Sequence, residues 1–136
     1  ESKEHFLRAT HLNPTIWQAH NNLGTIFGNQ GNMRKAVRHF EAALKVDSGN
    51  FEIHNNLGLV YGALNNREKA LIHFEFALQG KTNRHNVYLN IGNFFLEMGE
   101  DENALLNFRK ALQYDPKFLE ARKSIDKILT KRSLNK

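Results

Sequence analysis

The sequence predicts an all-α solenoid built from repeated pairs of helices, and three observations support this fold class. The tripeptide Asn22-Leu23-Gly24 returns at a fixed distance of 34 residues, as Asn56-Leu57-Gly58 and as Asn90-Ile91-Gly92. Apolar residues between these copies follow helical spacing. Short breaks that contain Gly or Asn separate the helical stretches. A period of this length is typical of arrays in which neighbouring units bury a shared core.

The repeats align without a gap over residues 17–50, 51–84 and 85–118. Six columns hold the same residue in all three copies, and in the first copy they are Asn22, Gly24, Ala36, Phe40, Ala43 and Leu44. Five of these columns are small or apolar, so packing alone explains them. The Asn column requires a different reason.

We expect residues 1–136 to form one repeat domain. Residues 1–14 are interpreted as the second helix of a truncated repeat, because Phe6 and Ala9 keep the register of Phe40 and Ala43. Three full repeats follow at 17–50, 51–84 and 85–118. Residues 119–136 are interpreted as a C-terminal capping helix and tail.

Each full repeat is predicted to contain two helices, at 17–29 and 33–46 in the first copy. The turn between them places Gly31 where a left-handed conformation ends a helix, and the same position holds Asn65 and Gly99 in the later copies. A Gly in the middle of each first helix costs about 1 kcal/mol relative to Ala. We therefore expect close approach of the paired helix there, with the small residue of the Ala36 column facing it.

The last helix is predicted to turn an apolar stripe inward and a basic face outward. The stripe is Leu119, Ile125, Ile128 and Leu129, and the basic face is Arg122, Lys123, Lys127 and Lys131. Residues 117–136 hold seven Lys or Arg against two acidic residues, which accounts for the net charge of +5. A solvated capping face is the simpler interpretation. The alternative, contact with nucleic acid or an acidic surface through 122–136, lacks aromatic residues that stack on bases, so nucleic acid is disfavoured.

The pattern resembles the tetratricopeptide repeat, a helix-turn-helix unit with a W-x2-L-G-x2-Y…A-x3-F…P signature. In this sequence Leu23-Gly24 and its two copies are followed by Phe27, Tyr61 and Phe95, and the second helices supply the Ala and Phe. Pro116 fits the signature, whereas Ser48 and Thr82 replace the Pro in the linkers. The resemblance implies a right-handed superhelix whose first helices line a concave groove.

Within that resemblance, the Asn column faces the groove and predicts a binding site for an extended peptide. An Asn amide has one acceptor and two donors, so it can pair with both groups of a peptide backbone. The predicted peptide-binding residues are Asn22, Asn56 and Asn90, flanked by Gln18, Asn21, Glu52, Asn55, Asn86 and Asn93. The alternative is that the Asn column binds a neighbouring helix and stabilises stacking.

Catalysis, cofactor binding and metal binding are not expected. The chain has no Cys, and no helix carries a His-x3-His pair with completing carboxylates. His20 and His54 occupy equivalent repeat positions, as do His39 and His73, which favours packing or surface roles. There is no apolar run of the roughly 18 residues that span a membrane. Residues 1–14 lack a signal-peptide core, so the cytoplasm is the default expectation.

The expected function is therefore a non-catalytic scaffold that binds a partner protein. No Lys or Arg lies in 17–29, 51–63 or 85–97, so we expect an uncharged or weakly basic segment. A second hypothesis is a substrate-recruiting arm of a larger glycosyltransferase, because the Asn ladder resembles the tetratricopeptide arm of O-linked N-acetylglucosamine transferase. A third hypothesis is self-assembly through the incomplete N-terminal repeat, giving a homo-oligomer.

Overall fold

The computed structural model describes residues 16–135, and the expectations for residues 1–14 lie outside this range. The described helices are α2 (Trp17–Asn29), α3 (Met33–Val46), α4 (Phe51–Ala63), α5 (Arg67–Ala77), α6 (Arg84–Glu97), α7 (Asp101–Tyr114) and α8 (Leu119–Leu134). No strand occurs among residues 16–135. The all-α helical-repeat fold is confirmed, and the bounds predicted for the first two full helices agree with α2 and α3.

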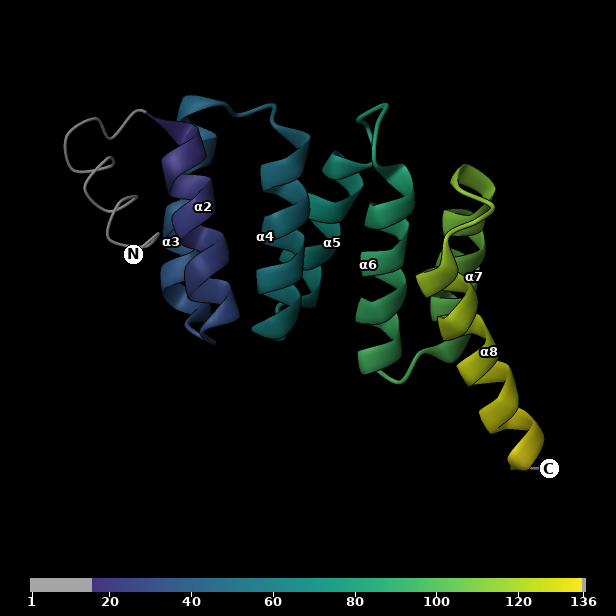
Figure 1. Cartoon of the computed structure of the whole chain (residues 1–136). Coiled ribbons are helices and arrows are strands. Elements are labelled where there is room, and N and C mark those ends of the chain that lie inside the picture. Colours follow the sequence, from purple (N-terminus) through teal and green to yellow (C-terminus); the bar gives the residue numbers. More distant parts are fainter. Residues whose placement is uncertain (1–15, 136) are drawn as a thin grey trace. The chain divides into compact units, whose positions relative to one another are not determined.

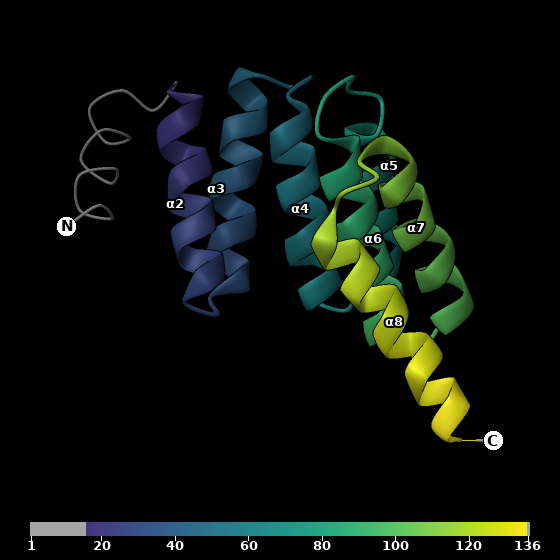
Figure 2. The same cartoon turned by 45° about the vertical axis from the view of Figure 1, so that its right-hand side comes forward.

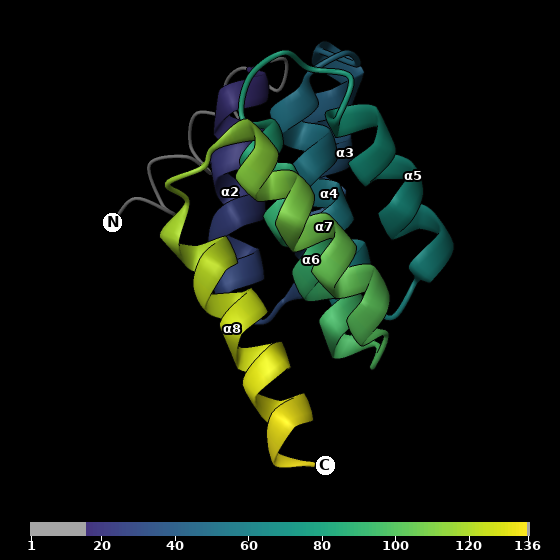
Figure 3. The ribbon, with the colours of Figure 1, turned by 90° about the vertical axis from the view of Figure 1, so that its right-hand side faces the viewer.

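The helices form two compact units, which meet in sequence between Gln79 and Gly80. In the first unit, α2 packs against α3, α4 packs against α5, and α3 joins the two pairs by contacting α4. Figure 1 shows α2 and α3 as a pair, and Figure 2 shows α2, α3 and α4 side by side. In the second unit, α6 packs against α7, and α7 packs against α8. Figure 3 shows α8 starting near α7, with its last turns extending past the α6–α7 pair.

Left-handed residues end the first helix of each repeat, as the sequence predicts. Gly31 and Gly99 have φ angles of 83° and 77°, and Asn65 has 60° at the equivalent position. The next helices of the first two repeats are then capped by asparagine, because the side chains of Asn32 and Asn66 accept hydrogen bonds from backbone N–H groups three residues later. The turn chemistry therefore repeats together with the core.

The central glycines let a phenylalanine ring of the paired helix pack directly on the first helix. A Cβ atom added at Gly24 would lie 2.5 Å from Cε1 of Phe40, far inside van der Waals contact. A Cβ atom added at Gly58 or at Gly92 would likewise lie 2.5 Å from the ring of Phe74 or of Phe108. The expectation that the Ala36 column faces these glycines is wrong: the Phe ring lies on the glycine, and Ala36 instead lies 3.8 Å from a Cβ added at Gly28.

The inward stripe of α8 also differs from the prediction. Ala121 and Ile128 are buried and Ile125 is half-buried, whereas Leu119 and Leu129 are 58% and 41% exposed. Helix α8 packs mainly against α7, so a narrow stripe at spacing i, i+4, i+7 is sufficient to cover its contact surface. Arg132 of α8 also forms an ion pair with Glu102 of α7.

The phenol of Tyr61 links the first two repeats. Tyr61 on α4 is 6% exposed, and its hydroxyl donates a hydrogen bond to Glu41 Oε2 on α3 at 3.1 Å. Burial, followed by the negative charge of Glu41, raises the pKa of Tyr61 to about 12.

Within residues 16–135, no helix is both long and apolar enough to cross a bilayer.

Replacing Gly24 with Ala should destabilise the first unit, whereas replacing Gly28 in the same helix should not. The Gly24 change forces a methyl group into the Phe40 ring and is expected to cost about 1–3 kcal/mol. The Gly28 change meets only ordinary contacts and should gain up to about 1 kcal/mol of helix propensity. Urea denaturation of both variants measures the difference. Equal stabilities would show that the Gly–Phe contact does not set the helix spacing.

Alkaline titration should separate Tyr61 from the other two tyrosines. Because folding raises its pKa above the unfolded value of about 10, the contribution of Tyr61 to stability is complete below pH 10. That contribution is then lost as the pH rises towards 12. Ultraviolet titration of the phenols should show a late ionisation that disappears in Tyr61→Phe and moves to lower pH in Glu41→Gln. Ionisation of Tyr61 at the usual phenol value of about 10 would contradict the buried Tyr61–Glu41 contact.

Candidate functional site

One exposed stripe on each first helix carries most of the predicted site residues. Positions separated by three or four residues share one helix face. On α2 this stripe is Gln18, Asn22, Thr25 and Asn29; on α4 it is Glu52, Asn56, Leu59 and Ala63; on α6 it is Asn86, Asn90, Asn93 and Glu97. The repetition of the Asn column therefore places one Asn near the middle of each stripe.

In the first unit, the stripes of α2 and α4 border a small pocket. The two helices contact each other directly. The pocket has a volume of about 180 Å³ and is lined by Gly24, Thr25, Gly28, Asn29, Met33, Phe40, Asn56, Leu59 and Val60. We call this pocket together with the exposed stripes of α2 and α4 the α2–α4 face. The pocket itself is mainly apolar, and Asn56 is one of its polar residues.

Asn56 is held in place by Asn21. Its Nδ2 donates a hydrogen bond to Oδ1 of Asn21 at 3.0 Å, across from α4 to α2. Asn21 is only 6% exposed, and its backbone carbonyl accepts a hydrogen bond from Thr25 Oγ1. A primary amide has a second N–H donor and a carbonyl acceptor beyond this bond. Asn21 thus positions the amide of Asn56 and is itself buried.

The other predicted site residues differ in exposure. Asn22, Gln18 and Glu52 are exposed, and Asn55 is half-buried on α4. In the second unit, Asn90 is half-buried, and Asn86 and Asn93 are exposed on α6. Asn55 and Asn90 both take part in further interactions. The exposure of the Asn column therefore differs between copies, because Asn22 is exposed whereas Asn56 and Asn90 are half-buried.

The third first helix, α6, differs from the prediction in its charge. The sequence predicts first helices without Lys or Arg, but α6 begins one residue earlier than expected and includes Arg84. Arg84 Nε donates to the carbonyl of Gly80 at 2.7 Å, and its guanidinium lies 5.6 Å from the ring centre of Tyr114. This cation is thus bound at the start of the helix, away from Asn90. Helices α2 and α4 contain no Lys or Arg, as expected.

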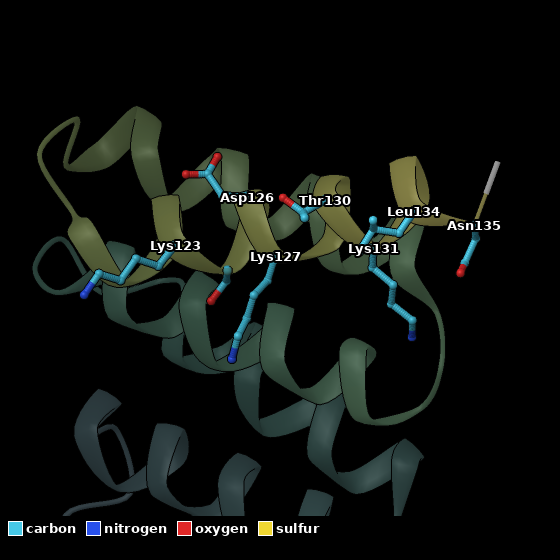
Figure 4. Close-up of a pocket in the computed structure, with 8 residues that line it drawn as sticks. Lys123, Asp126, Lys127, Thr130, Lys131, Leu134 and Asn135 are labelled. Atoms are coloured by element: carbon cyan, nitrogen blue, oxygen red, sulfur yellow. The ribbon is translucent and has the colours of Figure 1, made fainter.

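The basic residues of α8 surround a second surface pocket. Its volume is about 670 Å³, and it is lined by Lys123, Ser124, Asp126, Lys127, Thr130, Lys131, Leu134 and Asn135. Figure 4 shows the three lysines projecting from successive turns of α8. All lining residues come from this one helix, so the pocket consists of gaps between long, solvated side chains and is not a cleft between elements.

Histidine pairing is a feature that the sequence analysis missed. Nδ1 of His20 lies 3.2 Å from Nδ1 of His39, and Nδ1 of His54 lies 3.0 Å from Nδ1 of His73. The signal was available, because both pairs are separated by 19 residues. Repeat alignment relates each histidine to its equivalent in the next repeat, whereas its partner in space lies on the other helix of the same repeat. Across residues 16–135, no group of three or more His, Asp or Glu could hold a metal ion.

Comparison with known proteins identifies the repeats. Models of the tetratricopeptide repeat match residues 17–50, 51–79 and 85–118, which is more than half of the chain. Among curated proteins, none matches the sequence.

Solved structures of tetratricopeptide proteins share the fold at low sequence identity. MamA matches with a TM-score of 0.79 and 19% identity, covering 97% of this chain and 77% of its own. YrrB, described as having an unusual peptide-binding site, matches with a TM-score of 0.74 and 20% identity. The match covers 97% of this chain and 68% of the YrrB chain. The first tetratricopeptide domain of Spaghetti, bound to the HSP90 peptide SRMEEVD, matches with a TM-score of 0.72 and 18% identity. The match covers 86% of this chain and 93% of the Spaghetti domain. The matched repeats, rather than these distant similarities, show that the chain belongs to the tetratricopeptide repeat family.

Proposed function

We propose that the chain is a non-catalytic scaffold that binds an extended segment of a partner protein on the α2–α4 face. The observation that carries this proposal is the amide of Asn56, which Asn21 fixes beside an apolar pocket. A fixed amide loses little conformational entropy on binding, so its hydrogen bonds to a ligand contribute more fully to affinity. The stripe of Asn86, Asn90 and Asn93 on α6 offers a surface of the same chemistry in the second unit.

The chemistry of the face fits a peptide backbone with a small apolar side chain. The second N–H and the carbonyl oxygen of the Asn56 amide can pair with a peptide C=O and N–H. The pocket of about 180 Å³ is smaller than the roughly 300–1,000 Å³ typical of sites for drug-sized ligands. It has room for one side chain, and Leu59 and Val60 in its wall favour an apolar one. Asn22, exposed on the same face, would contact the next part of the segment.

The charge of the face favours an uncharged or weakly basic segment. Helices α2 and α4 carry no Lys or Arg, and Glu52 is exposed on the α4 stripe. The peptide bound to the Spaghetti domain contains the acidic run Glu-Glu followed by Val-Asp. An acidic segment of that kind would find no cation on α2 or α4 to offset its desolvation. The proposed segment is therefore of a different charge type.

Two wider roles remain hypotheses. The motif Asn-Asn-Leu-Gly occurs at Asn21–Gly24 and at Asn55–Gly58 and resembles the arm of O-linked N-acetylglucosamine transferase. This resemblance is the basis for the hypothesis of a substrate-recruiting role. A nucleotide-sugar-binding domain in the parent reading frame would favour that role. Self-assembly through the N-terminal residues would give a mass that rises with protein concentration in sedimentation measurements.

Binding by single-asparagine variants distinguishes a ligand role from a structural one. The probe is a peptide selected against the chain from a displayed library of short unstructured peptides. Asn22→Ala and Asn56→Ala should each lower its affinity by about 2- to 10-fold, the contribution of one hydrogen bond. Gln113→Ala, an exposed change on α7, should have no effect.

Asn21→Ala is the matched control, because it removes the same bond between α2 and α4 but no exposed group. It should lower affinity less than Asn56→Ala does, with similar thermal stability for the two variants. If Asn21→Ala and Asn56→Ala weaken binding equally while Asn22→Ala has no effect, the Asn column only joins helices.

A further inference from the structure

The first unit contains two histidine pairs that join its helices. His20 on α2 meets His39 on α3, and His54 on α4 meets His73 on α5, each through the two Nδ1 atoms. His20 and His54 are 9% and 8% exposed, whereas His39 and His73 are half-buried. Each pair therefore lies across the interface of one helical hairpin.

Hydrogen bonding selects the tautomers of the second pair when both rings are neutral. Nε2 of His54 lies 3.0 Å from the backbone carbonyl of Ser48. A carbonyl can only accept, so His54 carries its proton on Nε2 and its Nδ1 is an acceptor. The hydrogen bond of 3.0 Å between the pair then requires His73 to carry its proton on Nδ1. In the neutral pair, the unprotonated ring nitrogen of His73 is Nε2.

The pair can accept one proton without rearrangement, but not two. The first proton adds to Nε2 of His73 and leaves its Nδ1–H bonded to Nδ1 of His54. A second proton has to add to Nδ1 of His54, where the Nδ1–H of His73 already points. Two N–H groups of like charge would then face each other across 3.0 Å, with the hydrogen bond lost. Double protonation thus repels α5 from α4.

Aromatic neighbours pack against the histidine rings, and charged neighbours favour or oppose their protonation. Phe76 stacks on His54 at 3.9 Å between ring centres, and Tyr61 stacks on His73 at 5.5 Å. Glu41 from α3 and Lys69 from α5 act on His73 in opposite directions. Lys35 and Arg38, on the same helix as His39, oppose its protonation. A surface pocket of about 740 Å³, lined in part by His20, His39, Glu41 and Lys45, gives solvent access to the first pair.

These environments lower the pKa of His39 and of His73. Burial is the larger cause in both, followed by the partner imidazole. The unfolded chain therefore takes up these protons at a higher pH than the folded unit does. Stability is complete above the unfolded histidine value of about 6.5 and is lost as the pH falls from there to the lower folded values.

The second unit lacks these pairs. Tyr88 and Asn107 occupy the positions equivalent to His54 and His73. Tyr88 stacks on Tyr114, and Nδ2 of Asn107 donates to the carbonyl of Asn103 at 2.8 Å. Along α6–α8 the single histidine is His85, whose ring meets the edge of Phe118. The α6–α7 hairpin is thus a built-in control without a histidine pair.

We propose that the two histidine pairs form an acid-sensitive latch that keeps the α2–α3 and α4–α5 hairpins closed at neutral pH and loosens them under mild acid. His20 and His54 directly precede Asn21 and Asn55, so opening of the hairpins also disorders the α2–α4 face. The latch concerns the stability of the first unit and does not depend on whether that face binds a peptide. A partner bound there would be released on acidification, whereas α6–α8 would stay folded.

Hydrogen exchange and imidazole nitrogen spectra of the intact chain test this proposal directly. At neutral pH, the ¹⁵N spectra should show His54 protonated on Nε2 and His73 on Nδ1. On acidification from pH 7.5 to 5.5, amides of α2–α5 should exchange several-fold faster relative to their intrinsic rates, because the unfolded chain binds protons that the folded unit takes up only at lower pH. Amides of α6–α8 should change less than about twofold. Equal changes in both units, or the opposite tautomers, would overturn the latch.

The double variant His39→Asn/His73→Asn copies the residue that the third repeat has at this position. An Asn amide can still donate a hydrogen bond to Nδ1 of His54, but it does not become protonated in this pH range. The variant should therefore lose the acid-induced change in α2–α5, whereas the control His85→Asn should keep it. Should the double variant be unfolded at neutral pH, His73→Asn alone should remove the change in α4–α5 and leave that in α2–α3. An unchanged pH profile in a folded variant would contradict the proposal.

Discussion

The contact between a helix glycine and a phenylalanine ring determines the rest of this structure. In each repeat the Phe of the second helix lies on the face of the first helix, where any side chain larger than hydrogen would overlap it. Phe40, Phe74 and Phe108 are almost completely buried as a result. Because the contact recurs every 34 residues, the two helices of each pair adopt the same spacing and register. The opposite side of each first helix is then left to solvent.

This constraint explains where the asparagines lie. Asn22, Asn56 and Asn90 are each two residues before a packed glycine, so they lie to one side of the buried face. The partial exposure of the column then depends on what the neighbouring repeat provides. At Asn56, the neighbouring α2 provides the side-chain oxygen Oδ1 of the buried Asn21, so the same amide both joins helices and borders a pocket. The structural and the ligand roles of the Asn column are thus compatible at this position.

Much of the fold could be predicted because its determinants are local. The helix periodicity and the left-handed residues Gly31, Asn65 and Gly99 depend on few neighbours, and these predictions are confirmed. The partner of Gly24 was predicted wrongly, because spacing alone does not distinguish Ala36 from Phe40 one turn later on the facing helix. The exposure of Leu119 and Leu129 was missed, because hydrophobicity does not reveal how many helices pack against α8.

The candidate site was harder to predict, because its contacts join different helices. The Asn21–Asn56 bond spans 35 residues, and it depends on the packing of one repeat on the next. The histidine pairs depend on the register within a hairpin, which single-helix patterns do not contain. Identical spacing of 19 residues in two repeats was the signal in the sequence that could have indicated those pairs.

We propose that the α2–α4 face binds a peptide backbone through the exposed amide of Asn22 and the fixed amide of Asn56. The most direct measurement is a titration of the ¹⁵N-labelled chain with a selected peptide, following the side-chain NH₂ signals. If the peptide binds this face, the signals of Asn22 and Asn56 should shift together with the methyl signals of Leu59 and Val60. Shifts confined to the lysine face of α8 or to the outer surfaces of α3 and α5, with the Asn22 and Asn56 signals unchanged, would contradict it.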